Sequence, residues 1–494
     1  MVVAVTIGVN LNENGSNNDI EDNKKDHVAS SIKAVQTLCH PTNYEKECEE
    51  SLIAGAGNTT DPKELIKIFF NITITKIGDK LKETNILHEI EEEPRAKMAL
   101  DTCKQLMDLS IGELTRSLDG INEFNLINVD KILMNLKVWL SGAVTYQDTC
   151  LDGFENTTSD AGKKMKDLLT IGMHMSSNAL AIVTDLADTV NDWNITKSFG
   201  RRLLQDSELP SWVDQHRLLN ENASPFKRKP NVTVAIDGSG DFKSINEALK
   251  QVPEKNRKPF VIYIKEGVYQ EYVEVTKKMT HVVFIGEGGK KTRISGNKNF
   301  IDGTNTYRTA TVGTIDFVFG NALAIFQNCT FVVRKPLENQ QCIVTAQGRK
   351  EIQQPSGIVI QGGSIVSDPE FYSVRFENKA YLARPWKNYS RTIIMDTYID
   401  DLIDADGYLP WQGLEGPSGM DTCFYAEYHN IGPGSDKSKR VKWAGIWNLN
   451  SKAARWFSPS KFFHGTDWIE VTGIPYFPGV PKHHRHKKTI LNWQ

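Results

Sequence analysis

The spacing of hydrophobic residues changes once along this chain, near Pro230, and that change constrains the fold more than any other feature. From residue 28 to residue 190, hydrophobic residues recur at three- and four-residue steps, the pattern of amphipathic helices. In the clearest stretch, which follows an Asp61-Pro62 pair able to cap a helix, the spaced residues are Leu65, Ile68, Phe69 and Ile72. Several long segments of this kind with short connectors predict an antiparallel helix bundle.

After Pro230 the chain consists of short runs rich in β-branched and aromatic residues, separated by Gly, Asn and Asp. The runs around Phe326, Val359 and Ile394 follow one another at intervals of roughly thirty residues, and each has a polar break inside it. Evenly spaced short strands without helices between them are typical of a sandwich, a propeller or a β-solenoid. The chain is therefore predicted to be a two-domain α plus β protein.

Residues 191–230 separate these two regions and are predicted to form a linker, since they are charged and contain proline but show no regular period. The linker carries two basic residues followed by two leucines, namely Arg201, Arg202, Leu203 and Leu204. A dibasic site in an exposed linker is a natural target for a processing protease.

The charge of the chain argues against nucleic acid as a partner, because the formal net charge is −3 over 494 residues. Basic residues gather only in the tail, residues 481–494. Two explanations of this tail stay open, a solvated terminus and a segment attracted to an acidic polymer.

The cysteine and glycosylation patterns point to a secreted protein. Nine N-x-S/T sequons occur, and four of the seven cysteines lie in the first third of the chain, a combination that favours an oxidising compartment. No His/Cys cluster has the spacing of a zinc site. The mostly apolar N-terminal run is too short to span a bilayer, and we expect it to be the end of a targeting segment whose beginning is missing.

Asp316 is the residue that most invites a chemical role. It is the one acid in the apolar run that ends at Gly320-Asn321, and a buried carboxylate needs a cationic or hydrogen-bonding partner. The segment Tyr381–Thr392 offers Arg384 as that partner and Trp386 as a flat face for a sugar ring. From the residues alone, a structural salt bridge and a catalytic pair are both open.

Several ordered motifs together resemble those of plant pectin methylesterases. The first third of the chain resembles the inhibitor-like pro-domain that is fused to many of these enzymes. The motifs of the catalytic part are Val234–Leu249, Glu266–Val275, Gly313–Ala322, Thr345–Lys350, Leu382–Thr392 and Phe424–Gly434, and those of the pro-domain are Cys39–Cys48 and Tyr146–Phe154.

This resemblance implies a four-helix bundle over residues 28–190 and a right-handed parallel β-helix, here shortened, over residues 231–480. It also implies the disulfides Cys39–Cys48 and Cys103–Cys150, and processing at the Arg201–Leu204 motif. The implied activity removes methyl esters from the homogalacturonan of cell-wall pectin, giving pectate and methanol, without a metal or organic cofactor. We therefore expect a secreted protein of the cell wall, with an inhibitor–esterase contact as a further possibility.

The resemblance also assigns roles to single residues. Asp316 matches the nucleophile that attacks the ester carbonyl, and Arg384 matches the arginine that holds it and contacts substrate. Trp386 matches a tryptophan that stacks on substrate, and Thr306 matches a substrate-binding threonine. Ala383 stands where the family usually has glycine.

A stretch of the family pattern is missing between Val312 and Gly313. In the family this stretch carries a substrate-binding Gln, a Gln that stabilises the oxyanion, and the Asp that protonates methanol and then activates water. The Gln-Asp-Thr letters within Tyr146–Cys150 belong to the pro-domain pattern and do not replace it. The sequence thus predicts severely impaired catalysis. Three interpretations stay open: a pectinesterase precursor that has lost a segment, a catalytically impaired pectin-binding protein, and a methylesterase inhibitor.

Overall fold

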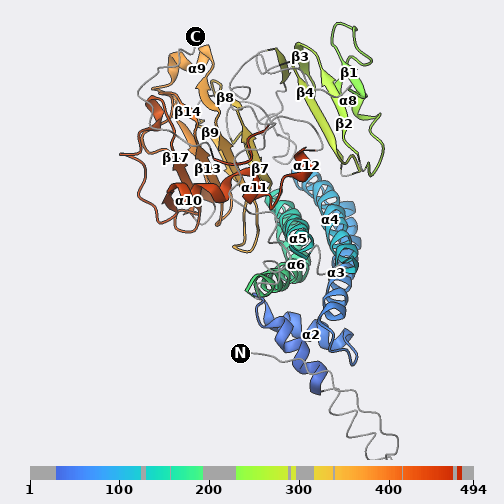
Figure 1. The fold of residues 1–494 in the computed structure, drawn as a ribbon. Coiled ribbons are helices and arrows are strands. Elements are labelled where there is room, and N and C mark those ends of the chain that lie inside the picture. Colours follow the sequence, from blue (N-terminus) through green and yellow to red (C-terminus); the bar gives the residue numbers. More distant parts are fainter. Residues whose placement is uncertain are drawn as a thin grey trace, which may run out of the picture. The chain divides into compact units, whose positions relative to one another are not determined.

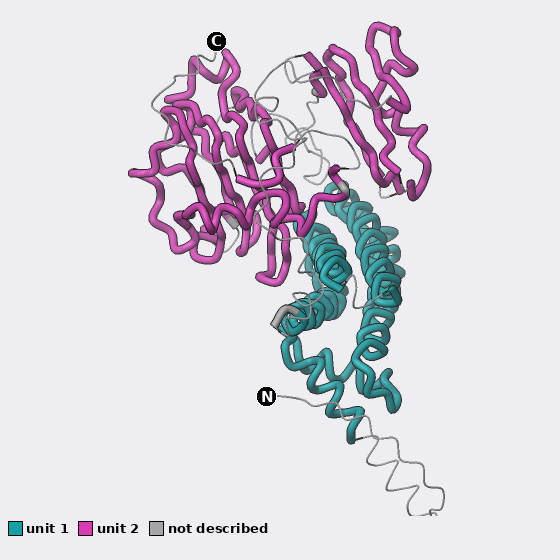
Figure 2. Tube along the Cα trace, viewed as in Figure 1, with its two compact units in different colours: residues 1–193 teal, residues 194–494 magenta. Residues whose placement is uncertain are grey.

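The computed structural model describes residues 29–123, 129–155, 157–192, 230–256, 258–276, 278–287, 291–295, 316–337, 340–413, 416–470 and 476–480. The chain divides into two compact units, Met1–Trp193 and Asn194–Gln494 (Figure 2). Five predicted features lie outside the described residues: the N-terminal apolar run, the Arg201–Leu204 motif, Thr306, the join at Val312–Gly313 and the basic tail 481–494. Within the described part, no helix is both long enough and apolar enough to cross a membrane.

The first unit is a four-helix bundle, as predicted (Figure 1). Its helices are α3 (Pro62–Ile90), α4 (Pro94–Asn122), α5 (Val129–Asp152) and α6 (Ala161–Asp192). Each of α3 and α5 packs against both α4 and α6, which closes the bundle. The Asp61 carboxylate accepts a hydrogen bond of 2.9 Å from the backbone N–H of Lys63, so Asp61 caps α3 as its sequence position predicts.

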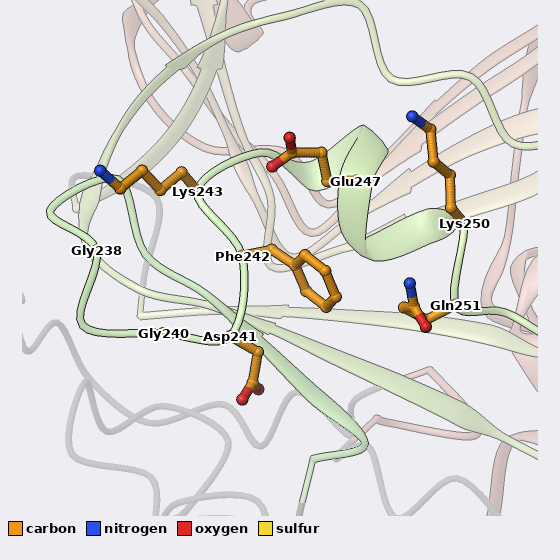
Figure 3. Close-up of a pocket in the computed structure, with 8 residues that line it drawn as sticks. All are labelled: Gly238, Gly240, Asp241, Phe242, Lys243, Glu247, Lys250 and Gln251. Atoms are coloured by element: carbon orange, nitrogen blue, oxygen red, sulfur yellow. The ribbon is translucent and has the colours of Figure 1, made fainter.

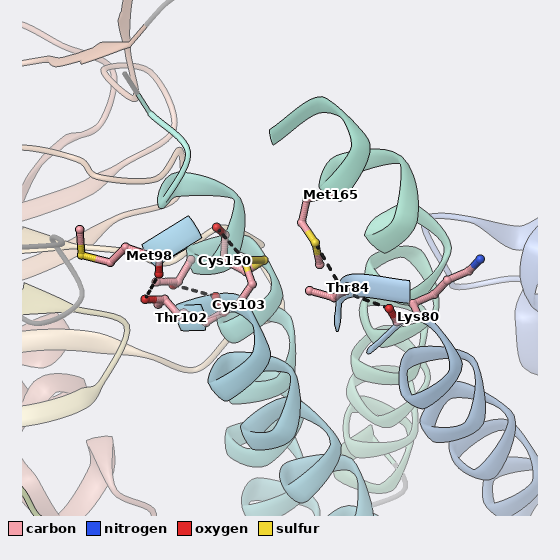
Figure 4. The surroundings of a disulfide bond; sticks show 9 residues. Lys80, Thr84, Met98, Thr102, Cys103, Cys150 and Met165 are labelled. Atoms are coloured by element: carbon pink, nitrogen blue, oxygen red, sulfur yellow. Dashed lines mark hydrogen bonds between the residues drawn. A yellow bond between two sulfur atoms is a disulfide. The ribbon is translucent and has the colours of Figure 1, made fainter. Parts of the chain in front are cut away.

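Two disulfides join the helices of this unit in the predicted pairing. Cys103–Cys150 links α4 to α5 (Figure 4), and Cys39–Cys48 links helical residues 29–39 to α2 (Glu45–Gly55). Between the helices, the buried Gln147 side chain donates to the hydroxyls of Ser110 and Ser176, at 3.1 and 2.7 Å. These cross-links fix the register of α4, α5 and α6, because a slipped helix would leave buried polar groups unpaired.

Most of the second unit is built from parallel strands that stack coil upon coil, which confirms the parallel β-helix. One sheet contains β7 (Leu323–Gln327), β10 (Gly357–Gln361), β13 (Arg391–Met395), β17 (Phe424–Tyr428) and β18 (Ile446–Asn448). A second contains β8 (Thr330–Val333), β11 (Ser364–Ser367) and β14 (Tyr398–Ile399). A third contains β6 (Val318–Gly320), β9 (Cys342–Gln347) and β12 (Ala380–Ala383).

The polar breaks that recur along the sequence are the turns of these coils. Residues with positive φ follow the strands of the first sheet: Asn328 at 52°, Gly362 at 66°, Asp396 at 53° and His429 at 52°. Gly, Asn and Asp tolerate this left-handed backbone better than other residues do, so they mark the turn in the sequence. Equivalent residues of successive coils, such as Gln327 and Gln361, are 34 positions apart and hydrogen-bonded at 2.8 Å.

The beginning of the second unit forms two further parallel sheets. One contains β1 (Val232–Val234), β2 (Phe260–Ile264) and β4 (Val282–Gly286), and the other pairs β3 (Gly267–Gln270) with β5 (Thr292–Ser295). Among the described strands, no pairing joins these sheets to the three larger ones. Strands β4 and β5 on one side, and β6, β7 and β8 on the other, therefore end their sheets. In the sequence, the predicted join at Val312–Gly313 falls between these two groups of strands, and it lies outside the described residues.

Shorter elements of this unit escape sequence analysis because they are too short to show a period. They are an antiparallel pair of strands, β15 (Trp411–Gly413) and β16 (Gly416–Ser418), and short helical segments. The helical segments are α8 (Ile245–Leu249), α9 (Pro369–Val374), η2 (Pro433–Ser435), α10 (Ser451–Ala454), η3 (Arg455–Phe457), α11 (Pro459–Phe462) and α12 (Asp467–Glu470).

Candidate active site

Asp316 lies just before the strand formed by the end of its apolar run. The strand β6 begins at Val318, and Asp316 precedes it with a φ of 49°. A left-handed backbone is unusual for a residue other than glycine and tends to occur where function requires a particular side-chain direction. Asp316 is not in an extended conformation, so the direction of its carboxylate is not set by the alternation of side chains between the two faces of a strand.

The third sheet brings Arg384 to Asp316. Val318 and Ala383 both pair with Thr345 of the central strand β9, so the start of β6 and the end of β12 lie level with each other on the two sides of β9. Arg384 follows β12 directly, and its backbone N–H donates to the Thr345 carbonyl at 3.1 Å. This register explains how two residues 68 positions apart meet.

The Arg384 guanidinium holds the Asp316 carboxylate at two atoms. Arg384 Nε lies 2.9 Å from Oδ1 and 3.1 Å from Oδ2, and Nη2 also donates to Oδ2. A forked pair of this kind fixes the plane of the carboxylate as well as its position. The partner that the sequence predicted for Asp316 is therefore the one found.

Burial and charge act in opposite directions on Asp316. The side chains of Asp316 and Arg384 are only 12% and 23% exposed. Burial raises the pKa of Asp316, and the Arg384 guanidinium opposes this rise by stabilising the ionised form. The guanidinium carbon of Arg384 lies 4.6 Å from the centre of the Trp411 ring, so the cation is itself held by an aromatic face. Sequence analysis did not single out Trp411, which stands in no recurrent spacing.

Trp386 is packed into the site more deeply than the sequence suggested. Its ring centre lies 4.2 Å from that of Phe319, and the residue is 8% exposed. The backbone of Gly348 packs closely against the Trp386 ring. A Cβ added to Gly348 would lie only 2.2 Å from Trp386 Cε3. Gly348 belongs to the Thr345–Lys350 motif, so that motif is needed to seat the tryptophan.

Two buried polar side chains of the second unit, Gln347 and Glu427, are fully engaged in hydrogen bonds. Gln347 accepts from the backbone N–H groups of Arg349 and Arg391, at 3.0 and 2.7 Å, and donates to Asn321 Oδ1 at 3.0 Å. Glu427 accepts from Arg440 Nε at 2.9 Å and from the Tyr408 hydroxyl at 3.2 Å. Neither side chain is free to donate a proton or to stabilise an oxyanion.

The described residues offer little else as a reaction centre. They contain no group of three or more His, Cys, Asp or Glu residues able to hold a metal ion. An open hollow of about 510 Å³ lies between Gly238 and Gln251 (Figure 3). Its four charged side chains, Asp241, Lys243, Glu247 and Lys250, do not converge on one point, so they do not form a ligand site. Among the described residues, the Asp316–Arg384 pair is therefore the candidate catalytic arrangement.

Two family models match this chain. The model described as pectinesterase matches residues 231–313 and 312–466, and the model described as plant invertase/pectin methylesterase inhibitor matches residues 33–182. The pectinesterase match is thus divided in two, and its parts meet at Val312–Gly313. This is the point at which the motif pattern is interrupted.

Known proteins align with almost the whole chain. The probable pectinesterase/pectinesterase inhibitor 21 of Arabidopsis thaliana is 42% identical over 546 residues, covering 97% of this chain and 80% of the relative. Since 97% of 494 residues is well short of 546, dozens of aligned positions have no residue here. Pectinesterase 3 of Citrus sinensis is 32% identical, covering 96% of this chain and 92% of the relative. The solved pectin methylesterase from carrot is 33% identical and covers 51% of this chain and 98% of its own, with a TM-score of 0.45.

Proposed function

Because the chain belongs to the pectinesterase family and carries an inhibitor-family domain at its N-terminal end, we propose that it is a pectinesterase precursor acting on methyl-esterified homogalacturonan. By family it is a carboxylic ester hydrolase. The observation that carries the proposal is the forked Asp316–Arg384 pair, held between motifs of the same family. We further propose secretion to the cell wall, with processing at Arg201–Leu204 in the linker.

Asp316 acts as the nucleophile in this proposal. Its carboxylate attacks the carbonyl carbon of a galacturonate methyl ester, methoxide leaves with a proton as methanol, and the acyl-enzyme is then hydrolysed by water. Arg384 holds the carboxylate in one orientation, which places its oxygen for attack. Trp386, Arg384 and Thr306 are proposed to contact the polysaccharide.

The proton donor of this reaction is the missing part. A general acid or base contributes roughly 10²–10⁴-fold to a rate, and one oxyanion donor roughly 10²–10³-fold. Methoxide is a poor leaving group, so its departure without a positioned acid is slow. We therefore propose that the chain turns over methylated pectin weakly, by way of Asp316, with water as the proton donor.

The pH dependence of methanol release tests the role of Asp316. Only the ionised carboxylate attacks, so the rate falls as the pH drops through the pKa of this residue. Burial raises that pKa above the ordinary value of 3.8, and we expect the acidic limb of the rate profile to have its midpoint above 3.8. A midpoint at or below this value in purified full-length chain contradicts the assignment.

A second candidate function is that of a catalytically impaired pectin-binding protein or of a methylesterase inhibitor. The interrupted pectinesterase match favours it, since the inhibitor-family match is continuous over residues 33–182. An inhibitor requires the helical region 28–190 alone to suppress methanol release by a partner pectin methylesterase. Full activity of the partner at a large excess of this region excludes that function.

A further inference from the structure

The second unit carries a strip of aromatic residues that no step of the proposed reaction uses. Trp447 on β18 stacks on Phe424 of β17, with ring centres 5.4 Å apart and 18° between the planes. Phe457 lies 5.5 Å from the same Phe424 ring, and Trp456 precedes it in η3. Trp447 and Trp456 are 51% and 64% exposed. One exposed indole therefore stacks on Phe424, and the other directly precedes a residue that packs on Phe424; we call Phe424, Trp447, Trp456 and Phe457 the aromatic strip.

The chain segment that carries Trp447 and Trp456 is rich in basic residues. From Lys437 to Thr466 the sequence contains seven Lys and Arg residues and no Asp or Glu. Arg440 is buried against Glu427, but the other six are exposed: Lys437, Lys439, Lys442, Lys452, Arg455 and Lys461.

Two of these cations are neighbours of the strip. Lys437 Nζ lies 3.2 Å from the side-chain oxygen of Asn448, which follows Trp447 in the chain, and Arg455 directly precedes Trp456. Exposed indole rings flanked by cations suit a ligand that has apolar faces and regularly spaced negative charges.

We propose that the aromatic strip binds de-esterified homogalacturonan, the acidic polysaccharide that the proposed reaction would produce. A galacturonate ring offers a C–H face to an indole and a carboxylate to a lysine or arginine. A methyl-esterified ring keeps the face but lacks the charge, so the cations favour product over substrate. The identity of the ligand rests on the proposed function, whereas the aromatic and charged groups are features of the surface itself.

The aromatic strip is connected to the candidate active site through one short segment. The backbone N–H of Phe424 donates to the Ser390 carbonyl at 2.8 Å, and Ser390 ends the segment that begins with Arg384 and contains Trp386. Binding at the aromatic strip would retain the enzyme on pectin that it has already de-esterified.

The test measures the affinity of the full-length chain for fully de-esterified oligogalacturonate, by titration calorimetry. The double variant Trp447→Ala/Trp456→Ala and the double variant Lys452→Glu/Arg455→Glu are each expected to bind at least about tenfold more weakly. Raising the salt concentration should weaken the parent and leave the charge-reversed variant little changed. The matched control is Tyr372→Ala/Phe376→Ala, which removes two other exposed aromatic rings (49% and 75% exposed) and should bind as the parent does.

Three results would overturn the proposal: no binding by the parent, parent-like binding by both double variants, or equal loss in the control. Parent-like binding of oligogalacturonate by both double variants is also expected if the strip docks a protein instead of a polysaccharide. Since the ligand is a product and needs no turnover, the readout is independent of methanol release. If the parent releases no methanol but binds oligogalacturonate, and the tryptophan variant binds it more weakly, then the binding site is present without the esterase function.

Discussion

Replacing Asp316 by Asn is expected to reduce methanol release from methylated pectin to the uncatalysed background. An amide does not attack an ester as a carboxylate does, and no other described carboxylate lies beside Arg384 to take over. The substitution keeps the shape of the side chain and its capacity to accept from Arg384, so the fold should survive. The measurement is initial-rate methanol release by parent and variant at equal, folded concentration.

The chain provides a matched control for this experiment. Asp401 is also held by an arginine at two atoms, with Arg375 Nε 2.9 Å from Oδ1 and Nη2 3.0 Å from Oδ2. Asp401→Asn weakens an ion pair of the same geometry away from the proposed nucleophile, and it should leave the rate of methanol release unchanged. If Asp316→Asn retains the parental rate, Asp316 is not the nucleophile.

The fold was largely predictable because both halves rest on repetition. In the bundle, Leu65 and Phe69 follow the helical spacing and are 1% and 0% exposed. In the β-helix, Phe326, Ile360 and Ile394 are paired across three coils, at the spacing that the sequence shows. A repeated structure repeats its turn chemistry, so its period is visible without knowledge of the contacts.

The site was predictable in its chemistry and less so in its geometry. A buried acid requires a partner, and this requirement identified the Asp316–Arg384 pair. The burial of Trp386 was not predicted, because it depends on Gly348 leaving room for the ring. Trp411 contacts Arg384 only through the folding of a later segment, which no local pattern marks. Such contacts between coils are decided by the fold and not by spacing.

Restoring the missing stretch is expected to have the largest effect of any change to this chain. The insert is the part of the 42%-identical Arabidopsis thaliana relative that has no counterpart here, placed between Val312 and Gly313. The resemblance implies that it supplies the acid and two glutamines, so methanol release should rise by at least roughly 10²-fold and by as much as 10⁴-fold. It should also supply strands that pair with β4 and β7, each of which ends its sheet among the described strands. This added pairing should raise the thermal stability.

These two effects are separated by a second insert in which the Asp of the Gln-Asp-Thr motif is replaced by Asn. This insert has the same length and can pair with the same edges, but it lacks the proton donor. It should recover the gain in thermal stability while losing most of the gain in rate. Equal rates for the two inserts would show that the deficiency lies in the fold and not in the missing acid.

The most direct test is the ratio of methanol-release rates between the chain with the intact insert and the parent chain. If Asp316 and Arg384 are in place and only the acid and the oxyanion donor are missing, this ratio is at least roughly 10². The gain should be abolished by Asp316→Asn in the restored chain. A ratio near one, with both chains folded, would contradict this prediction.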